Sequence, residues 1–205
     1  VTFSITGGAD QAKFSINSST GVLVFQSAPD FESPTDTGAN NTYEVEVTAT
    51  DDGAGTLTDV QTITMTVQDV NEAPVITSNA GGATASINVA ENTTAVTTVT
   101  ATDVDGDTVT FGIQGGAGTG NEDSALFSIN TGTGVLVFSS APDFETKLDH
   151  NTDNVYNVIV TATDDGAGAL SDTQTLSVTV TDVADTATTH NGTIVISGSA
   201  TATAS

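Results

Sequence analysis

The sequence contains no cysteine and no tryptophan, and only two of its 205 residues are basic. The absence of cysteine excludes disulfide bonds and thiolate metal sites. Against the two lysines stand 26 acidic residues, which give a formal net charge of −24. Nucleic acids and anionic membrane surfaces attract clusters of Lys and Arg, so neither is an expected partner. A cation is the natural counterpart of such a chain.

Long hydrophobic runs are also absent. No run approaches the roughly 18 apolar residues that a membrane-spanning helix needs, so we expect no direct insertion of this segment into a membrane. The chain begins with Val1 rather than Met, and we interpret it as an internal piece of a longer protein. Few aromatic residues, together with many Thr, Val, Ser, Ala and Gly, predict a secreted, β-rich protein exposed at a surface.

An internal repeat organises the chain. FSINSSTGVLVFQSAPDFE, which starts at residue 14, returns as FSINTGTGVLVFSSAPDFE at 127, and YEVEVTATDDGAG at 43 returns as YNVIVTATDDGAG at 156. Both pairs are displaced by the same 113 residues, from 14 to 127 and from 43 to 156, which is the length of a whole domain. We therefore predict one repeat at 1–70, a complete repeat at 71–183, and a linker with the possible start of a following domain at 184–205.

The first of these repeats is expected to be truncated. Val1, Thr2 and Phe3 align with Val109, Thr110 and Phe111, so nothing in the first repeat corresponds to residues 75–108. That segment includes two predicted strands, and a sandwich without them would expose open sheet edges.

Strand-like residues alternate within each repeat. In YEVEV, Tyr43, Val45 and Val47 share one face while Glu44 and Glu46 share the other, which is the period-two pattern of a half-buried strand. Such runs are separated by Gly, Asp and Asn turns, and no helical pattern interrupts them. The fold class predicted is all-β, with tandem seven-stranded antiparallel Greek-key β-sandwiches. The strands expected in the complete repeat lie near 85–89, 96–101, 108–113, 126–130, 134–138, 155–163 and 172–181.

Acidic side chains gather at the ends of the predicted strands. Because strand ends of a sandwich cluster at two poles, residues far apart in sequence can meet there. Carboxylates about 5 Å apart repel by roughly 3 kcal/mol per pair at an effective dielectric near 20, so a cation is expected among them. Ca²⁺ accepts six to eight oxygens in flexible geometry, whereas transition metals favour His or Cys. An EF-hand loop requires glycine at its sixth position and a bidentate glutamate at its twelfth. Counted from Asp103, the glycine falls fourth, at Gly106, and the twelfth residue is Gln114, so this motif does not fit.

Taken in order, the motifs VAENT, ATDVDGD, PDFE, TATDDG and DVNEAP resemble a cadherin repeat, specifically the cadherin-like repeats of large bacterial surface adhesins. The resemblance covers roughly residues 1–185 and implies a sandwich of the cadherin and immunoglobulin type. It also implies that Ca²⁺ ions are held between consecutive repeats by residues of both.

Residue by residue, the resemblance implies two sets of calcium ligands. The set at the junction between the two repeats comprises Asp30, Glu32, Asp69, Asn71, Glu72, Asp103, Asp105, Asp164 and, through its backbone oxygen, Asn121. The set that faces the next junction comprises Glu91, Asp143, Glu145 and Asp182. In DVADTA, Ala184, Asp185 and Ala187 replace the Asn, Glu and Pro of DVNEAP, so Ca²⁺ is expected to bind more weakly there or not at all.

These features predict a non-enzymatic, calcium-dependent rigid extender or adhesion segment of an extracellular bacterial adhesin. The expected partners are calcium ions, neighbouring repeats of the same chain, and another cell surface or a polysaccharide. One alternative is a non-catalytic spacer in a large secreted enzyme. Another is a carbohydrate-binding module, which the absence of Trp and the presence of only two Tyr disfavour. Asp143 and Glu145 resemble a hydrolase pair, but no pocket residues accompany them in sequence.

Overall fold

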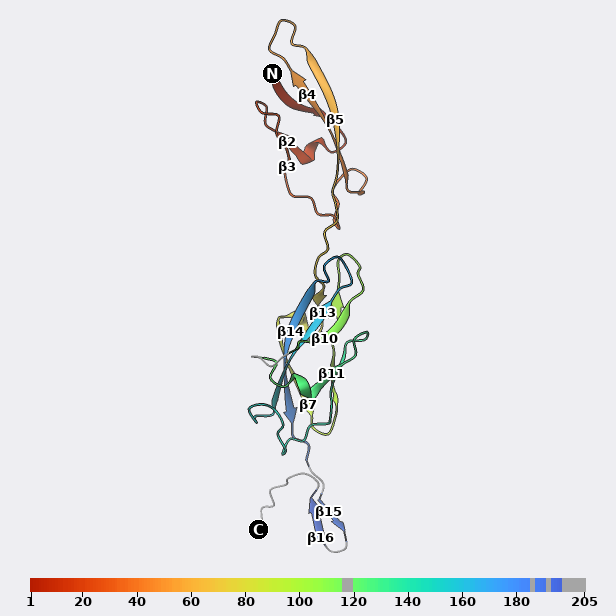
Figure 1. Cartoon of the computed structure of the whole chain (residues 1–205), viewed down its shortest axis with the longest axis vertical. Coiled ribbons are helices and arrows are strands. Elements are labelled where there is room, and N and C mark those ends of the chain that lie inside the picture. Colours follow the sequence, from red (N-terminus) through yellow and green to blue (C-terminus); the bar gives the residue numbers. More distant parts are fainter. Residues whose placement is uncertain (116–119, 185–186, 191–192, 197–205) are drawn as a thin grey trace. The chain divides into compact units, whose positions relative to one another are not determined.

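The computed structural model describes residues 1–115, 120–184, 187–190 and 193–196. The chain divides into two compact units, which we call unit 1 (Val1–Val70) and unit 2 (Asn71–Ser205). β-Strands make up nearly all of the regular structure in both (Figure 1). No α-helix occurs in the described residues, and none of their short 3₁₀ helices has the length or apolarity to cross a membrane.

Unit 1 contains a three-stranded sheet and a short hairpin. The sheet has the order β1 (Thr2–Gly7), β4 (Thr42–Thr50), β5 (Thr58–Thr66), and all its pairings are antiparallel. The hairpin joins β2 (Phe14–Ile16) to β3 (Leu23–Phe25), and the 3₁₀ helix η1 (Gln11–Lys13) precedes it.

Unit 2 has a larger set of sheets. Its main sheet has the order β10 (Thr110–Ile113), β13 (Val155–Thr163), β14 (Ser171–Thr181), β7 (Thr84–Ala90). A second sheet has the order β11 (Phe127–Ile129), β12 (Val135–Phe138), β8 (Ala95–Thr98). The smaller elements are the pair β6 (Val75–Ile76) and β9 (Ala101–Thr102), the hairpin β15 (Ala187–His190) and β16 (Thr193–Ile196), and the 3₁₀ helices η2 (Asn79–Gly81) and η3 (Ser124–Leu126).

The all-β sandwich class predicted from the alternation is confirmed, and each of the seven expected strands has a counterpart among β7, β8 and β10–β14. Two details differ from the prediction. β7 pairs with β14 in parallel rather than antiparallel. The strand expected at 96–101 is split into β8 and β9, because Val99 donates its N–H to Gly134 O and the chain then crosses to pair with β6.

The alternating residues build the core of unit 2. Along β13, Tyr156, Val158, Val160 and Ala162 are at most 1% exposed, and they pack against buried residues such as Leu176 on β14. At about 25 cal/mol per Å² of buried apolar surface, each of the valine and leucine side chains among them contributes roughly 1.5–3 kcal/mol relative to full exposure. The neighbouring strands β13 and β14 are visible at the centre of unit 2 in Figure 1.

The same positions are less covered in unit 1. Ile63 and Met65 of β5 are partly exposed, whereas their counterparts Leu176 and Val178 on β14 are fully buried. In unit 2 the second edge of β14 is paired with β7, and among the described residues no strand pairs with the second edge of β5. The pairing of β7 therefore helps to bury Leu176 and Val178 on β14, and the equivalent residues of β5 lack such a neighbouring strand in the described part of unit 1.

A buried carboxylate braces each unit at equivalent places. Asp10 is 3% exposed and accepts backbone N–H groups from Thr37 at 2.6 Å and Glu44 at 2.8 Å. In unit 2, Asp123 accepts from His150 at 2.7 Å and Asn157 at 2.8 Å. Each carboxylate thus ties the start of its 3₁₀ helix to a loop and to a strand more than 25 residues away.

We expect Asp10→Asn to destabilise unit 1 by about 1–3 kcal/mol, because an amide nitrogen cannot accept one of the two N–H groups. Burial raises the pKa of the Asp10 carboxyl, but hydrogen bonds from Glu44 and Thr37 and the nearby Lys13 outweigh it and hold this pKa below its ordinary value of 3.8. The stabilisation is therefore complete above the ordinary pKa and is lost as pH falls through the lowered folded value.

Urea unfolding of unit 1 at several pH values measures both effects. The exposed Asp59 serves as the matched control, and Asp59→Asn is expected to leave stability nearly unchanged. Equal stability of Asp10→Asn and the unmodified chain at neutral pH would contradict the bracing role.

Candidate metal centres

Three aspartates of one loop lie together at one end of unit 2. The loop between β9 and β10 carries Asp103, Asp105 and Asp107, each partly buried, and each offers one carboxylate oxygen within 4.8 Å of the others. Two oxygens that bind the same Ca²⁺ at about 2.4 Å lie at most about 4.8 Å apart. The spacing of the three oxygens therefore suits a shared hard cation.

The hydrogen bonding of these side chains tests whether a cation fits. Asp103 Oδ1 accepts N–H groups from Asp105 at 3.0 Å and Asp107 at 3.4 Å. Asp103 Oδ2 and Asp105 Oδ1 are buried and accept no hydrogen bond within the described chain. A buried charged oxygen without a donor is costly, and a coordinated Ca²⁺ would remove that cost. The donor set, made only of oxygens, fits this ion.

Further acidic residues surround Asp107. Burial raises its pKa above the ordinary value, as do the carboxylates of Asp103, Asp165, Asp105 and Asp164. This part of the site is therefore an accumulation of like charges.

Asn71 and Gly166 complete the same corner of unit 2. Asn71 donates its side-chain amide to Asp164 Oδ2 at 3.2 Å. A Cβ at Gly166 would collide with the side chains of Asn71 and Asp107, so only glycine permits this close approach.

The linker motif that precedes β6 is fastened to unit 2 by carboxylates. Glu72 donates its N–H to Asp105 Oδ2 at 2.9 Å, and Ile76 donates to Asp172 Oδ2 at 2.8 Å. Pro74 between them is buried. Residues 71–76 are thus part of unit 2, and Glu72 and Asp105 also offer carboxylate oxygens within 4.8 Å of each other.

A second acidic group lies at the far end of unit 2, where β7 and β14 end. Glu91, Glu145 and Asp182 offer carboxylate oxygens within 4.8 Å of one another. Glu91 is only 3% exposed and accepts N–H groups from Phe144 at 3.0 Å and Val183 at 2.8 Å. Asp143 Oδ1 instead accepts from its own loop, from Glu145 and Thr146 at 3.0 Å each.

Unit 1 repeats part of this arrangement. Glu32 and Asp69, the counterparts of Glu145 and Asp182, offer carboxylate oxygens within 4.8 Å of each other. Asp30 Oδ1 accepts N–H groups from Glu32 and Ser33 at 3.1 Å, as Asp143 does in its loop.

Asn121, which the family resemblance placed in the junction set, forms side-chain hydrogen bonds with the segment before it and with β13. Its amide donates to Gln114 O at 2.7 Å, and its Oδ1 accepts from Ile159 N at 2.8 Å. Ile159 precedes Asp164 by five residues, which is about 16 Å along extended chain. Its backbone oxygen also accepts the N–H of Ser124. Asn121 therefore orders the loop before η3, and its backbone oxygen as a calcium ligand stays a prediction.

Asp107 was missed from the sequence. The resemblance assigned ligand roles only to Asp103 and Asp105, although Asp107 ends the same ATDVDGD motif. The density of aspartates in DVDGD was the available signal, because a segment of five residues cannot place its third carboxylate far from the other two.

Comparison with known proteins identifies the type of repeat in unit 2. The family model described as Cadherin domain matches residues 85–181, which run from β7 to the end of β14. Unit 2 contains a cadherin-like repeat. Its acidic groups lie just before β10, just after β13 and at the ends of β7 and β14, so they occupy the two ends of the cadherin sandwich.

Several proteins with cadherin in their names are similar to the chain. Human Protocadherin Fat 1 is 32% identical over 187 residues, which are 91% of this chain and 4% of that protein. Human Protocadherin-23 is 34% identical over 192 residues, or 90% of this chain and 5% of that protein. The crystal structure of human Protocadherin-24 EC1-2 superposes with a TM-score of 0.57 at 21% identity, covering 89% of this chain and 82% of that one. The chain thus spans only a small part of the two curated relatives.

We expect Asp107→Asn to raise the melting temperature of the cadherin-like repeat when a chelator is present, because it removes a charge that its neighbours repel. The raised pKa of Asp107 means that the penalty exists at neutral pH and disappears as pH falls through that raised value. The gain should therefore vanish below the ordinary pKa of 3.8. Calorimetric scans at pH 7 and pH 3.5 check this, with Asp59→Asn as a control for net charge. A lower melting temperature for Asp107→Asn at pH 7 would contradict it.

Proposed function

We propose that this chain is a non-enzymatic, calcium-dependent extender or adhesion segment, in which ions held between consecutive cadherin-like repeats fix the angle of the joint. The observation that supports this most directly is the pair of buried oxygens Asp103 Oδ2 and Asp105 Oδ1, which accept no hydrogen bond in the described chain. The repeat to which they belong contains a single lysine, Lys147, which forms no salt bridge with either aspartate.

The residues that would hold the ions come from both units. Unit 1 would contribute Asp30, Glu32 and Asp69, and unit 2 would contribute Asn71, Glu72, Asp103, Asp105, Asp107 and Asp164. Bound Ca²⁺ would be the positively charged partner that these carboxylates otherwise lack. The carboxylates of one unit would then cease to repel those of the other, and the short connection at Asp69 and Val70 would be held in one conformation.

We place the segment outside the cell or on its surface, where millimolar Ca²⁺ suits sites of this class. Its partners would be calcium ions, neighbouring repeats, and another cell surface or a polysaccharide. The bacterial adhesin context rests on the motif resemblance alone, since the curated relatives named above are human.

We expect the 205-residue chain to give an extended, uniform scattering profile with Ca²⁺ and a heterogeneous one with chelator. Extracellular sites bind at about 10⁻⁴–10⁻³ M, and a hundredfold excess over Kd stabilises the bound state by about 2.7 kcal/mol per site. Small-angle X-ray scattering measures the change. The double variant Asp103→Ala, Asp105→Ala should remain heterogeneous under both conditions.

The control variant Glu44→Ala, Asp59→Ala removes the same charge from exposed positions of unit 1 and should respond to Ca²⁺ like the unmodified chain. Identical profiles with and without Ca²⁺ would show that the acids are only a solvated surface.

A further prediction concerns the two ends of unit 2. Ala184 replaces the Asn of the first linker, so the group of Glu91, Glu145 and Asp182 should bind Ca²⁺ more weakly than the group around Asp103. In calorimetric titrations, Asp103→Ala with Asp105→Ala should remove the tighter phase, and Glu145→Ala with Asp182→Ala the weaker one. Loss of the tighter phase in the second variant would reverse the assignment.

A further inference from the structure

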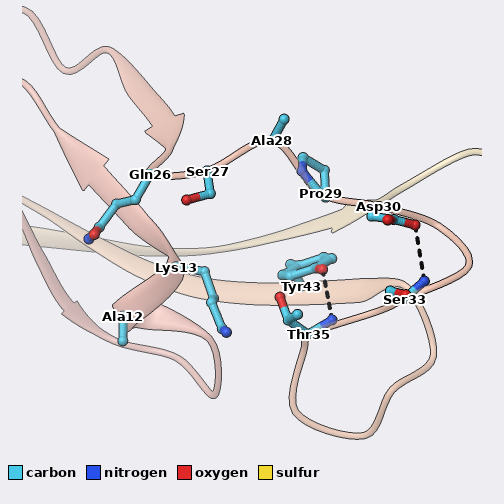
Figure 2. A pocket seen from close by; sticks show the side chains of 10 residues that line it. All are labelled: Ala12, Lys13, Gln26, Ser27, Ala28, Pro29, Asp30, Ser33, Thr35 and Tyr43. Carbon is cyan, nitrogen blue, oxygen red and sulfur yellow. Dashed lines mark hydrogen bonds between the residues drawn. The ribbon is translucent and has the colours of Figure 1, made fainter.

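The two units carry a pocket at the same place, with different linings. In unit 1 the pocket has a volume of about 310 Å³ and lies between η1, the segment from Gln26 to Asp30, and Tyr43 (Figure 2). The equivalent pocket of unit 2 has about 110 Å³ and is lined by Leu126, Phe138 and Leu148 among others. Ligand pockets of proteins begin at roughly 300 Å³, so only the pocket of unit 1 has room for a small molecule.

Two substitutions between the repeats account for the difference in chemistry. Lys13 of unit 1 stands where unit 2 has Leu126, and Thr35 stands where it has Leu148. Tyr43 and its counterpart Tyr156 are conserved between the two, and each hydroxyl accepts a backbone N–H from the loop at 3.3 Å. The tyrosine is thus common to both pockets, while the lining of the unit 1 pocket is the more polar of the two.

Lys13 is one of two basic residues in a chain with 26 acidic ones, and it is partly buried. Nevertheless, no carboxylate of the described residues lies within 4.0 Å of its ammonium group. Figure 2 shows Lys13 and Tyr43 on one side of the pocket and the segment from Gln26 to Asp30 on the other. The pocket therefore holds a cation that interacts with Asp10 over a longer distance but forms no salt bridge with the described residues, so its ammonium group can bind a ligand anion.

The other lining groups indicate the class of the partner. The hydroxyls of Ser27, Ser33 and Thr35 both donate and accept, and the exposed carboxylate of Asp30 accepts. A ligand with several hydroxyl groups satisfies both kinds of lining group. One negative charge matches Lys13, whereas a dianion would be repelled by Asp30.

We propose that the pocket of unit 1 binds a sugar acid, with the ligand carboxylate on Lys13 and its hydroxyl groups on Ser27, Thr35 and Asp30. The same chemistry occurs in a free sugar acid and in a uronic acid residue of a polysaccharide. Lys13 and Thr35, which distinguish this pocket from its counterpart in unit 2, are not among the proposed calcium ligands, but Asp30 is shared with them, so the test is made with a chelator.

The test is an NMR titration of the ¹⁵N-labelled 205-residue chain with galacturonate. A chelator is present, so that Ca²⁺ cannot link the ligand carboxylate to acidic side chains of the protein. We expect shifts of amides at residues 12–13 and 26–35 and none at 125–126 and 139–148. Galactose, which lacks the carboxylate, should bind at least about tenfold more weakly, as expected for loss of a charge-assisted hydrogen bond. Trigalacturonate distinguishes a polysaccharide ligand from a free sugar acid. If it causes the same shifts as galacturonate, the pocket accepts a uronic acid residue within a polysaccharide, and if it causes none, the pocket accepts only the free sugar acid.

Two variants carry unit 2 residues into unit 1. Lys13→Leu should weaken galacturonate binding about tenfold or more, and Thr35→Leu should weaken it by filling the pocket. Lys147→Leu removes the other lysine and should leave binding unchanged. Equal shifts in both units, undiminished binding by Lys13→Leu and Thr35→Leu, or no shifts at all would overturn the proposal.

Discussion

The shortage of positive charge governs how this chain satisfies its acidic residues. Two lysines cannot pair with 26 carboxylates, so the backbone N–H groups act as the partners of those that are buried. Asp10, Asp123, Glu91 and Asp164 each accept at least two such groups. Hydrogen bonds to an ionised acceptor are stronger than neutral ones. The acidic side chains therefore cross-link loops that lie far apart in sequence.

Buried acidic residues of this chain differ in how many of their carboxylate oxygens accept a backbone N–H group. Asp10 and Asp123 have both oxygens occupied by N–H groups, and their function is complete within the fold. Asp103 and Asp105 each have one buried oxygen for which the described chain provides no donor. The same residue type is thus structural in one loop and available for a cation in another, according to how many N–H groups the local backbone presents.

The sequence predicted those features that local alternation encodes. The long strands β13 and β14 follow directly from the period-two pattern that starts at Tyr156. The parallel pairing of β7 with β14 joins residues about 90 positions apart and has no local signature. The hydrogen bonds of the Asn121 side chain to Gln114 and Ile159 could not be predicted, because motif position says nothing about which donors and acceptors a side chain meets after folding. The set that the family resemblance assigned to the next junction comprised Glu91, Asp143, Glu145 and Asp182, and the structure groups the carboxylates of Glu91, Glu145 and Asp182.

The parallel pairing has a mechanical consequence. β7 and β14 are joined over seven residue pairs, from Thr84 with Thr175 to Ala90 with Thr181. A pulling force on the two ends of unit 2 reaches β7 through its first residue and β14 through its last. Because the strands run in the same direction, this force slides them past each other and loads all the connecting hydrogen bonds at once. An antiparallel pair in that place would open like a zipper, one bond after another.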